Sequence, residues 1–245
     1  MLIMLKETLK NRSLFFLMLV LLSACGSQTE KLEQEARERM KNGKFAEAVS
    51  LLDEIIKTTQ ASAEIYNMRG AAHYNLNKNA EALTDFDQAI RQDSSNYRFY
   101  YNRGNVKRTL NRPESAIKDY TSALQLESNQ YEIYLNRALS YQAVRNNAAA
   151  LQDFNQAELL SNGKDAKIYF YRGKLRMVLE DFEGALSDFK ASLAIEPQNG
   201  EAYLGLALAR INIEGEANEE SCQDIERSVQ LGFLGAEQFK EEYCK

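Results

Sequence analysis

The apolar positions of this chain recur with a period of about 34 residues. An aromatic residue stands four positions after one small residue and three positions before another, as in Ala82, Phe86 and Ala89. The same triplet returns around three later aromatic residues, Tyr120, Phe154 and Phe189. Spacings of four and three return to one face of a helix. Each triplet therefore predicts an amphipathic helix that buries its aromatic side chain against neighbouring helices.

A second pattern precedes each triplet and predicts another helix. Small residues recur at intervals of 34 or 35 residues, at Ala36, Gly70, Gly104, Ala138, Gly173 and Ala207. A tyrosine stands four positions before five of them, at Tyr66, Tyr100, Tyr134, Tyr169 and Tyr203. A small residue lets two helices approach closely, so we expect it at the closest approach of the two helices in each unit. Asn77-Lys78-Asn79 and Asn111-Arg112-Pro113 are expected turns between helices.

The period and residue types resemble those of the tetratricopeptide repeat, a helix-turn-helix unit of 34 residues. The resemblance covers Thr29 to about Leu231, with tyrosine at the position of the family's tryptophan. It implies an all-α fold, a tetratricopeptide-repeat α-solenoid that winds as a right-handed superhelix and ends in a C-terminal capping helix. The expected units span residues 29–62, 63–96, 97–130, 131–164, 166–199 and 200–231, and the cap spans 232–245.

An arginine on the first helix of four units is followed 16 residues later by an aspartate on the second. The pairs are Arg69 with Asp85, Arg103 with Asp119, Arg137 with Asp153, and Arg172 with Asp188. Arginine and carboxylate can form a bidentate pair that fixes orientation. A ligand site would not recur identically in four units, so we interpret the series as structural ion pairs. The sequence leaves open whether Asp153 pairs within its unit or with Arg172 of the next.

In the family, the first helices line a concave groove that binds extended peptides or partner helices. Carried over to this chain, the groove positions include Asn67, Tyr74, Arg98, Tyr101, Asn105, Arg108, Asn136, Lys167, Phe170 and Lys174. Asn105, Asn136 and Lys167 partly match the family's clamp for a C-terminal carboxylate, but two basic clamp positions hold Tyr101 and Tyr171. An aliphatic end of the groove is either a partner site or is covered by Leu234, Phe239 and Tyr243 of the cap.

The N-terminus has the pattern of a secretory signal. Lys6, Lys10 and Arg12 precede an uncharged run over residues 14–22, which is shorter than the roughly 20 residues of a membrane-spanning helix. Leu22-Ser23-Ala24 before Cys25 resembles the bacterial lipobox. The resemblance implies a lipoprotein signal peptide over residues 1–24 and a lipidated Cys25 with a short tether over 25–30. The alternative is an ordinary signal peptide, with Cys25 as a bystander.

Net charge and cysteine content limit the ligands and cofactors that this chain is expected to bind. The chain carries a net charge of −5, which argues against nucleic-acid binding. With Cys25 lipidated, Cys222 and Cys244 remain, and they fit a disulfide between antiparallel helices in an oxidising compartment. The alternative is two buried free thiols. The only histidine is His73 and there is no Cys-x-x-Cys, so we expect no metal, no other cofactor and no catalytic triad.

These patterns predict a non-enzymatic scaffold or adaptor that binds a partner protein or peptide, with no small-molecule substrate. The lipoprotein resemblance implies attachment to a membrane of the cell envelope. The absence of an inner-membrane-retention aspartate after Cys25 favours the outer membrane of a Gram-negative bacterium, facing the periplasm. Two alternatives remain at this stage, a regulatory subunit of an envelope enzyme and a self-associating structural array.

Overall fold

The structure is a computed structural model that describes residues 28–244. The expected signal peptide and Cys25 lie outside the described residues. A first helix covers residues 28–41. It is followed by α2 (Phe45–Thr58), α3 (Ala63–Asn75), α4 (Asn79–Gln92), α5 (Tyr97–Thr109), α6 (Pro113–Leu126), α7 (Tyr131–Ala143), α8 (Asn147–Ser161), α9 (Ala166–Val178), α10 (Phe182–Ile195), α11 (Gly200–Glu214), α12 (Glu219–Gln230) and α13 (Ala236–Tyr243).

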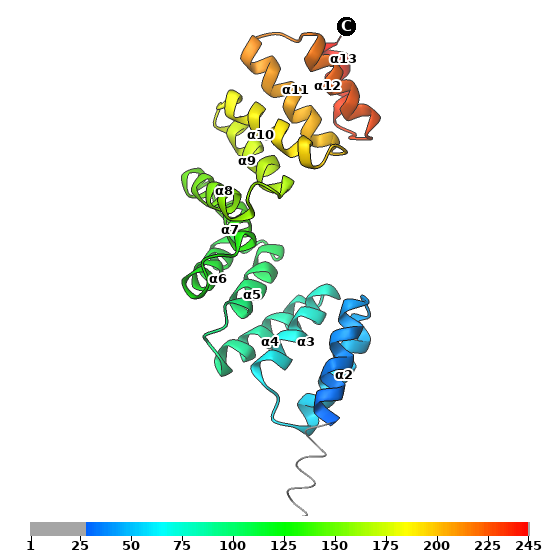
Figure 1. Cartoon of the computed structure of the whole chain (residues 1–245), viewed down its shortest axis with the longest axis vertical. Helices are drawn as coiled ribbons and strands as arrows, with labels where there is room; N and C mark the ends of the chain where they lie inside the picture. The colour runs from blue at the N-terminus through cyan, green and yellow to red at the C-terminus, as the bar shows by residue number, and fades with distance from the viewer. Residues whose placement is uncertain (1–27, 245) are drawn as a thin grey trace, which may run out of the picture. The chain divides into compact units, whose positions relative to one another are not determined.

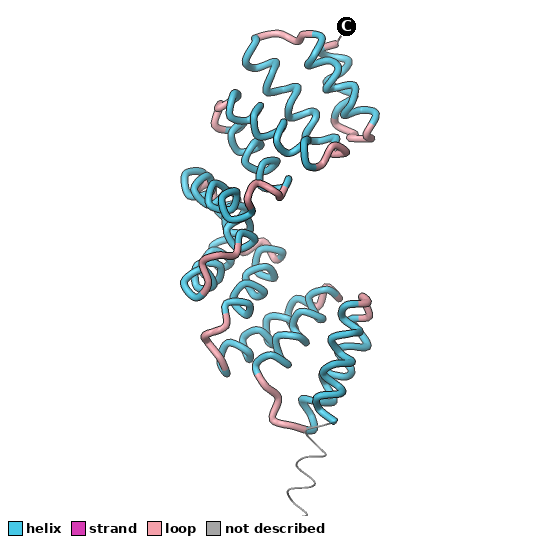
Figure 2. Tube along the Cα trace, viewed as in Figure 1, coloured by secondary structure: helices cyan, strands magenta, loops and turns pink. Residues whose placement is uncertain are grey.

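Helices and short connections make up all of the described chain, and the predicted all-α tetratricopeptide-type fold is confirmed (Figures 1 and 2). The chain divides into two compact units, Met1–Val106 and Lys107–Lys245, whose boundary falls inside α5. In the first unit α3 packs on α4, and in the second α7 packs on α8, α9 on α10 and α11 on α12. Each helix mainly contacts its neighbours in the chain, as expected of stacked repeats.

The recurring aromatic residues form the centre of each helix pair. Phe86, Phe154 and Phe189 are almost completely buried, and so are the alanines beside them. A Cβ atom added to Gly70 would lie 2.9 Å from Cε1 of Phe86, and one added to Gly173 would lie 3.1 Å from Cε1 of Phe189. The small residues of the first helices are therefore needed because the aromatic rings of the second helices occupy the adjacent space.

The turns within the units share a left-handed residue at the same repeat position. Gly43, Asn77, Asn111, Arg145 and Glu180 have φ values of 72°, 59°, 54°, 59° and 60°. Glycine and asparagine adopt this conformation at low cost, whereas arginine and glutamate do so less readily. Pro113, the last residue of the expected turn, begins α6, at a position where its missing N–H is not needed.

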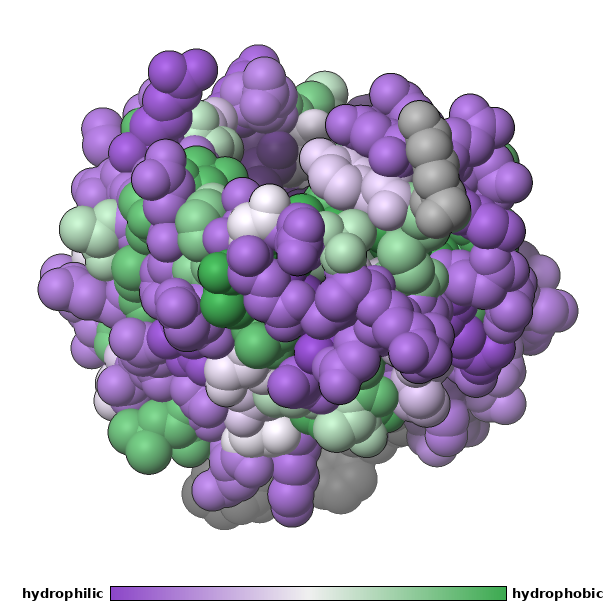
Figure 3. Space-filling model, turned by 90° about the horizontal axis from the view of Figure 1, so that it is seen from above, coloured by the Kyte–Doolittle hydropathy of each residue, from purple (hydrophilic) through white to green (hydrophobic). Residues whose placement is uncertain are grey.

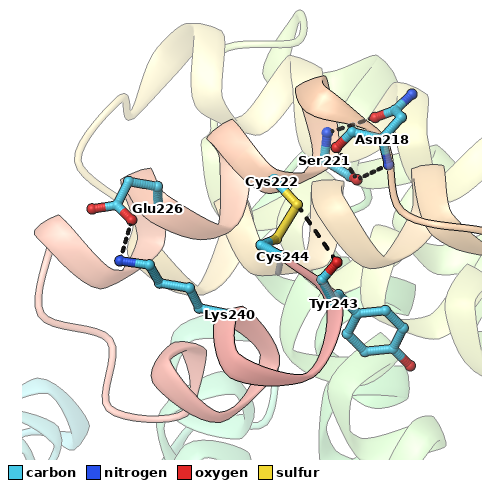
Figure 4. Close-up of a disulfide and its surroundings, with 7 residues drawn as sticks. All are labelled: Asn218, Ser221, Cys222, Glu226, Lys240, Tyr243 and Cys244. Atoms are coloured by element: carbon cyan, nitrogen blue, oxygen red, sulfur yellow. Dashed lines mark hydrogen bonds and ion pairs between the residues drawn. A yellow bond between two sulfur atoms is a disulfide. The ribbon is translucent and has the colours of Figure 1, made fainter.

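The predicted disulfide is present and ties the last helix to the repeat before it (Figure 4). Cys222 near the start of α12 is bonded to Cys244 just after α13, with a Cα–Cα distance of 5.6 Å. Nearby, Nζ of Lys240 on α13 lies 2.5 Å from Oε2 of Glu226 on α12. Asn218 and Ser221 cap the start of α12 reciprocally through side chain and backbone. The end of the array is thus fixed by one covalent and several polar contacts.

The closing helix is shorter than predicted and buries fewer of its apolar residues. α13 begins at Ala236 rather than at residue 232. Phe239 packs against the cluster that contains Leu204 and Ile211, so the cap covers part of the aliphatic surface of α11. The expectation that Leu234 contributes to the cap is wrong, because this side chain precedes the helix and is 96% exposed. None of the helices described here combines the length and hydrophobicity needed to cross a lipid bilayer.

Candidate partner-binding surface

Three of the predicted arginines, Arg69, Arg137 and Arg172, are each held within their own repeat by an aromatic ring and a carboxylate. Arg137 on α7 donates from Nε to Oδ2 of Asp153 (2.7 Å) and from Nη2 to Oδ1 (2.8 Å). Its guanidinium carbon lies 5.6 Å from the ring centre of Tyr134, one helical turn earlier. The same bidentate contact joins Arg69 to Asp85 and Arg172 to Asp188. Asp153 therefore pairs with the arginine of its own repeat and not with Arg172 of the next.

A further contact, which was not predicted from the sequence, links each of the four arginines to the preceding repeat. The remaining nitrogen, Nη1, donates to a side chain on the previous second helix. The acceptors are Asp53 for Arg69 (2.6 Å), Asp87 for Arg103 (2.7 Å), Thr121 for Arg137 (3.1 Å) and Asn155 for Arg172 (2.7 Å). These acceptors are 16 or 17 residues before the arginine, and this recurrence of short polar residues was visible in the sequence. Arg69, Arg137 and Arg172 thus each connect three consecutive helices.

Arg103 belongs to the first compact unit and Asp119 to the second. The ion pair between them therefore stays a prediction. Within the second unit, Nζ of Lys107 lies 2.7 Å from Oδ2 of Asp119. The same repeat position holds His73, whose Nε2 lies 3.9 Å from Oδ2 of Asp85. It also holds Arg176, which donates from Nη1 to Oδ2 of Asp188 at 2.9 Å. His73, Lys107 and Arg176 therefore lie next to the buried carboxylates of the Arg–Asp series.

The pKa shifts of the arginines agree with a structural role for the Arg–Asp pairs. The hydrogen bond with Asp85 is the main cause of the raised pKa of the Arg69 guanidinium. Burial opposes the charge of Arg172, but hydrogen bonds with Asp188 and Glu158 outweigh it and raise the pKa of Arg172. Arginine is therefore always charged here, and its charge is neutralised by partners within the fold. Such a group offers little to an external ligand.

The predicted groove residues of the first unit differ in accessibility. Asn67 is only 7% exposed, and its side-chain oxygen accepts a hydrogen bond from Nδ2 of Asn102 at 2.8 Å. It therefore joins two first helices rather than lying open to a partner. Arg98 is exposed, and its guanidinium carbon lies 5.7 Å from the ring centre of Tyr97. The half-buried residues of this face are Tyr74, Tyr101 and Asn105.

The predicted groove residues of the second unit also differ in accessibility, and the partial carboxylate clamp stays a prediction. Asn136 is half-buried and donates from Nδ2 to the carbonyl oxygen of Glu132 at 2.9 Å. Lys167 is exposed and Arg108 is half-buried. Phe170 is 8% exposed, with its ring centre 6.3 Å from that of Phe189. It forms core rather than an accessible anchor.

An apolar pocket of about 240 Å³ lies between the first helices of the last two repeats. We call it the Phe189 pocket, and its lining residues are Lys174, Met177, Phe189, Glu201, Leu204, Gly205, Leu208 and Phe233. A Cβ atom on Gly205 would approach Cζ of Phe189 to 2.5 Å, so glycine is required here. Lys174 crosses the rim, with Nζ 2.6 Å from Oε1 of Glu201 and 5.2 Å from the ring centre of Phe170.

Lys174 was predicted as a groove residue and an aliphatic end of the groove was expected, but Phe189, Gly205 and Phe233 were not predicted as parts of one pocket. A signal existed at Gly205, because the equivalent position of the preceding repeat holds Tyr171. Loss of that large side chain leaves space on the first-helix face. The contribution of Phe233 could not be read from the repeat, because it comes from the turn between α12 and α13.

The fold and this surface define an α-helical repeat scaffold of the kind that mediates protein–protein interactions. A family model described as "Tetratricopeptide repeat" matches residues 34–97, 67–132 and 135–200, which is more than half of the chain. The chain belongs to the tetratricopeptide repeat family. This is a family of interaction scaffolds that generally lack enzymatic activity. The sequence gives no match among curated proteins.

Solved structures with the same fold have low sequence identity to this chain. The Pseudomonas aeruginosa protein pilF is 16% identical, with a TM-score of 0.78 over 89% of this chain and 99% of pilF. The C-terminal part of a repeat protein from Cytophaga hutchinsonii is 19% identical, with a TM-score of 0.70 over 86% of this chain and 83% of that one. YrrB, described as having an unusual peptide-binding site, is 19% identical, with a TM-score of 0.66 over 78% of this chain and 97% of YrrB.

Proposed function

We propose that this protein is a lipid-anchored adaptor of the bacterial cell envelope that holds a segment of a partner protein on the face formed by its first helices. The observation that carries the proposal is the Phe189 pocket. It is a hollow with mainly apolar walls, whereas most of the face drawn in Figure 3 is hydrophilic. Pockets that accept a large side chain are typical centres of binding energy in protein interfaces. The peptide-binding site described for YrrB supports the same use of the fold.

Two features support the envelope and its oxidising compartment. The sequence Leu22-Ser23-Ala24-Cys25 follows a short apolar run with a basic start, which favours lipid attachment at Cys25. The disulfide between Cys222 and Cys244 is of a kind that persists in the periplasm or outside the cell and is rare in the reducing cytosol. We extend the proposal to the outer membrane, with the repeats facing the periplasm.

Site-specific photocrosslinking in cells tests the binding face. A photoreactive residue at Lys174 or Lys167 is expected to capture the same discrete partner, because both positions lie on the first helix α9 and Lys167 is exposed. Leu159 on α8 is the matched control, since it is 69% exposed but lies on a second helix outside the Phe189 pocket. Capture of one partner only from Leu159, or of none from any position, would contradict the proposed binding face.

The anchor is tested separately. Cys25→Ser is expected to release the protein from the membrane fraction or to block its maturation, because a serine hydroxyl cannot take the place of the acylated thiol. Fractionation of cells without detergent, followed by mass spectrometry of the mature N-terminus, measures both effects. A Cys25→Ser protein that matures normally and remains in the membrane fraction would rule out lipid attachment at this residue.

A further inference from the structure

A second hollow adjoins the Phe189 pocket at the C-terminal end of the array. Its volume is about 730 Å³, and it lies between the α10–α11 loop and the turn that precedes α13. Glu201 and Phe233 line both hollows, which makes them neighbouring parts of one surface. Ile195 and Leu231 add apolar area to the second hollow. The combined site therefore offers a mainly apolar pocket with a larger hollow beside it.

The surroundings of this surface are strongly acidic. Residues 196–244 contain eleven aspartates and glutamates but only three lysines and arginines, a net charge of −8, whereas the whole chain carries −5. Glu196 lines the second hollow, is exposed and forms no ion pair with any residue of the described chain. Glu201 stands between the hollows, where its pairing with Lys174 is half-exposed to solvent. Acidic side chains are thus placed where a bound segment would pass.

Helix dipoles do not reverse this preference. The C-terminus of α10 and the N-terminus of α11 both border the second hollow. The partial negative charge at the first and the partial positive charge at the second oppose each other. Side-chain charge therefore decides which ligands are attracted to the site, and it favours cationic groups.

A second copy of this chain is the less suitable occupant. Leu234 is 96% exposed and follows Phe233 directly, so an apolar side chain is available for insertion into another molecule. Such an insertion would bring together two C-terminal segments, each with a net charge of −8 over residues 196–244. Like charges across an interface oppose association. The charge pattern favours a different protein whose binding segment is basic.

We infer that the Phe189 pocket and the adjoining hollow form one docking site for a basic segment of a partner protein. The segment places a bulky apolar side chain in the pocket and an adjacent lysine or arginine against Glu196 and Glu201. This inference rests on the proposed function, because it specifies the chemistry of the partner that the first-helix face binds.

A peptide selection on the full chain tests this specificity. The full-length protein is placed in nanodiscs of phosphatidylcholine and a random peptide library is selected on it, after subtraction on empty nanodiscs. Enriched peptides are expected to contain a leucine, methionine or aromatic residue next to lysine or arginine. Synthesised copies should bind roughly tenfold more weakly when the apolar residue is changed to alanine. Their affinity should also fall as salt is raised.

Matched variants test whether the selected peptides bind at the proposed docking site. Met177→Lys puts a charge into the pocket and should weaken peptide binding roughly tenfold. Val178→Lys changes the next residue of the same helix, which is 72% exposed and does not line the pocket, and should bind normally. Glu196→Lys should weaken binding about threefold. Glu216→Lys alters net charge equally but lies beyond the opposite end of α11, about 20 Å from Glu201, and should have a smaller effect.

The outcomes separate this inference from the proposed function. Peptides that bind Met177→Lys and Val178→Lys equally would show binding elsewhere on the chain, which overturns the docking site but leaves the adaptor function intact. Enriched acidic peptides would also overturn it. A dimer that forms through Leu234 and is lost in Leu234→Ser would assign the pocket to a second copy. A selection that yields no binding peptide would count against both the docking site and peptide recognition by this face.

Discussion

Replacement of Arg137 by alanine is expected to destabilise the second unit strongly. Arg137 is 16% exposed, and its partner Asp153 is only 7% exposed. Without the guanidinium, the Asp153 carboxylate loses its bidentate partner in a nearly closed environment. The variant also loses the hydrogen bond between Arg137 and Thr121 and the contact with the Tyr134 ring. Helices α6, α7 and α8 therefore lose their shared connection at once.

The size of the effect follows from this geometry. Breaking a buried ion pair by removing one partner costs about 3–5 kcal/mol. The partial exposure of Arg137 places this case near the lower end of that range. The hydrogen bond with Thr121 adds about 1 kcal/mol, and the aromatic contact about 0.5 kcal/mol. Since these terms are not independent, we expect the free energy of unfolding to fall by about 3–4 kcal/mol.

Urea unfolding of the full chain, followed by circular dichroism and by tyrosine fluorescence, measures the change. Agreement between the two probes tests whether unfolding is cooperative, which repeat arrays do not always satisfy. Lys118→Ala on α6 is the control, because this lysine is exposed and makes no ion pair with the residues described here. Its effect should stay within about 0.5 kcal/mol.

A double-mutant cycle with Asp153→Ala tests whether the loss comes from the pair. We expect a coupling energy between about 0.5 and 3 kcal/mol, with the double variant more stable than the sum of the single losses predicts. Photocrosslinking to the partner should fall only in proportion to the folded protein. Loss of partner capture at unchanged stability would refute the structural role of Arg137, and additive single effects would refute the coupling.

Three further changes test other parts of the fold. Gly205→Ala should lower stability by about 1–3 kcal/mol, because its Cβ would lie 2.5 Å from the Phe189 ring; an unchanged urea midpoint would contradict this packing. Replacement of Cys222 and Cys244 by serine should cost about 3 kcal/mol in the chain-entropy model, and reductant should then no longer lower the melting temperature as it does in the native protein. Glu180→Asn should stabilise by roughly 0.5–1 kcal/mol, because φ at this residue is 60°; a lower melting temperature would contradict the strain assigned to it.

The sequence was sufficient to predict the helical repeat because its information is local. Each unit carries its own small residue, aromatic residue and turn at a constant spacing, so the assignment of one unit supports that of the next. Gly70 and Phe86 illustrate this, because their residue types and spacing already imply the close contact that the structure contains. The disulfide could also be predicted, because Cys222 and Cys244 lie at ends of neighbouring antiparallel helices.

The detailed roles of individual polar residues were harder to predict. Asn67 occupies a groove position in the repeat, but its hydrogen bond with Asn102 closes it off. That contact depends on how closely two first helices approach, which the repeat pattern does not specify. The third bond of each arginine raised the same difficulty, because its acceptor is an aspartate, a threonine or an asparagine in different repeats, as at Asp53, Thr121 and Asn155. Any short polar side chain satisfies the donor, so no single residue type marks the position.

The placement of the pocket has a physical reason in the repeat itself. Where the repeat is regular, the tyrosine and arginine of the first helix are fully engaged with neighbouring helices, and a partner finds few unsatisfied groups. The last repeat departs from this pattern, since Leu206 stands at the arginine position and Gly205 replaces a larger residue. Within the described chain, the bridge to the preceding repeat is absent there, because Lys190 stands where earlier repeats supply an acceptor, and Arg210 of α11 bonds only forward, to α12, through Asp224. The departures that remove a structural bridge also leave apolar surface open, so specificity is expected where the repeat is least regular.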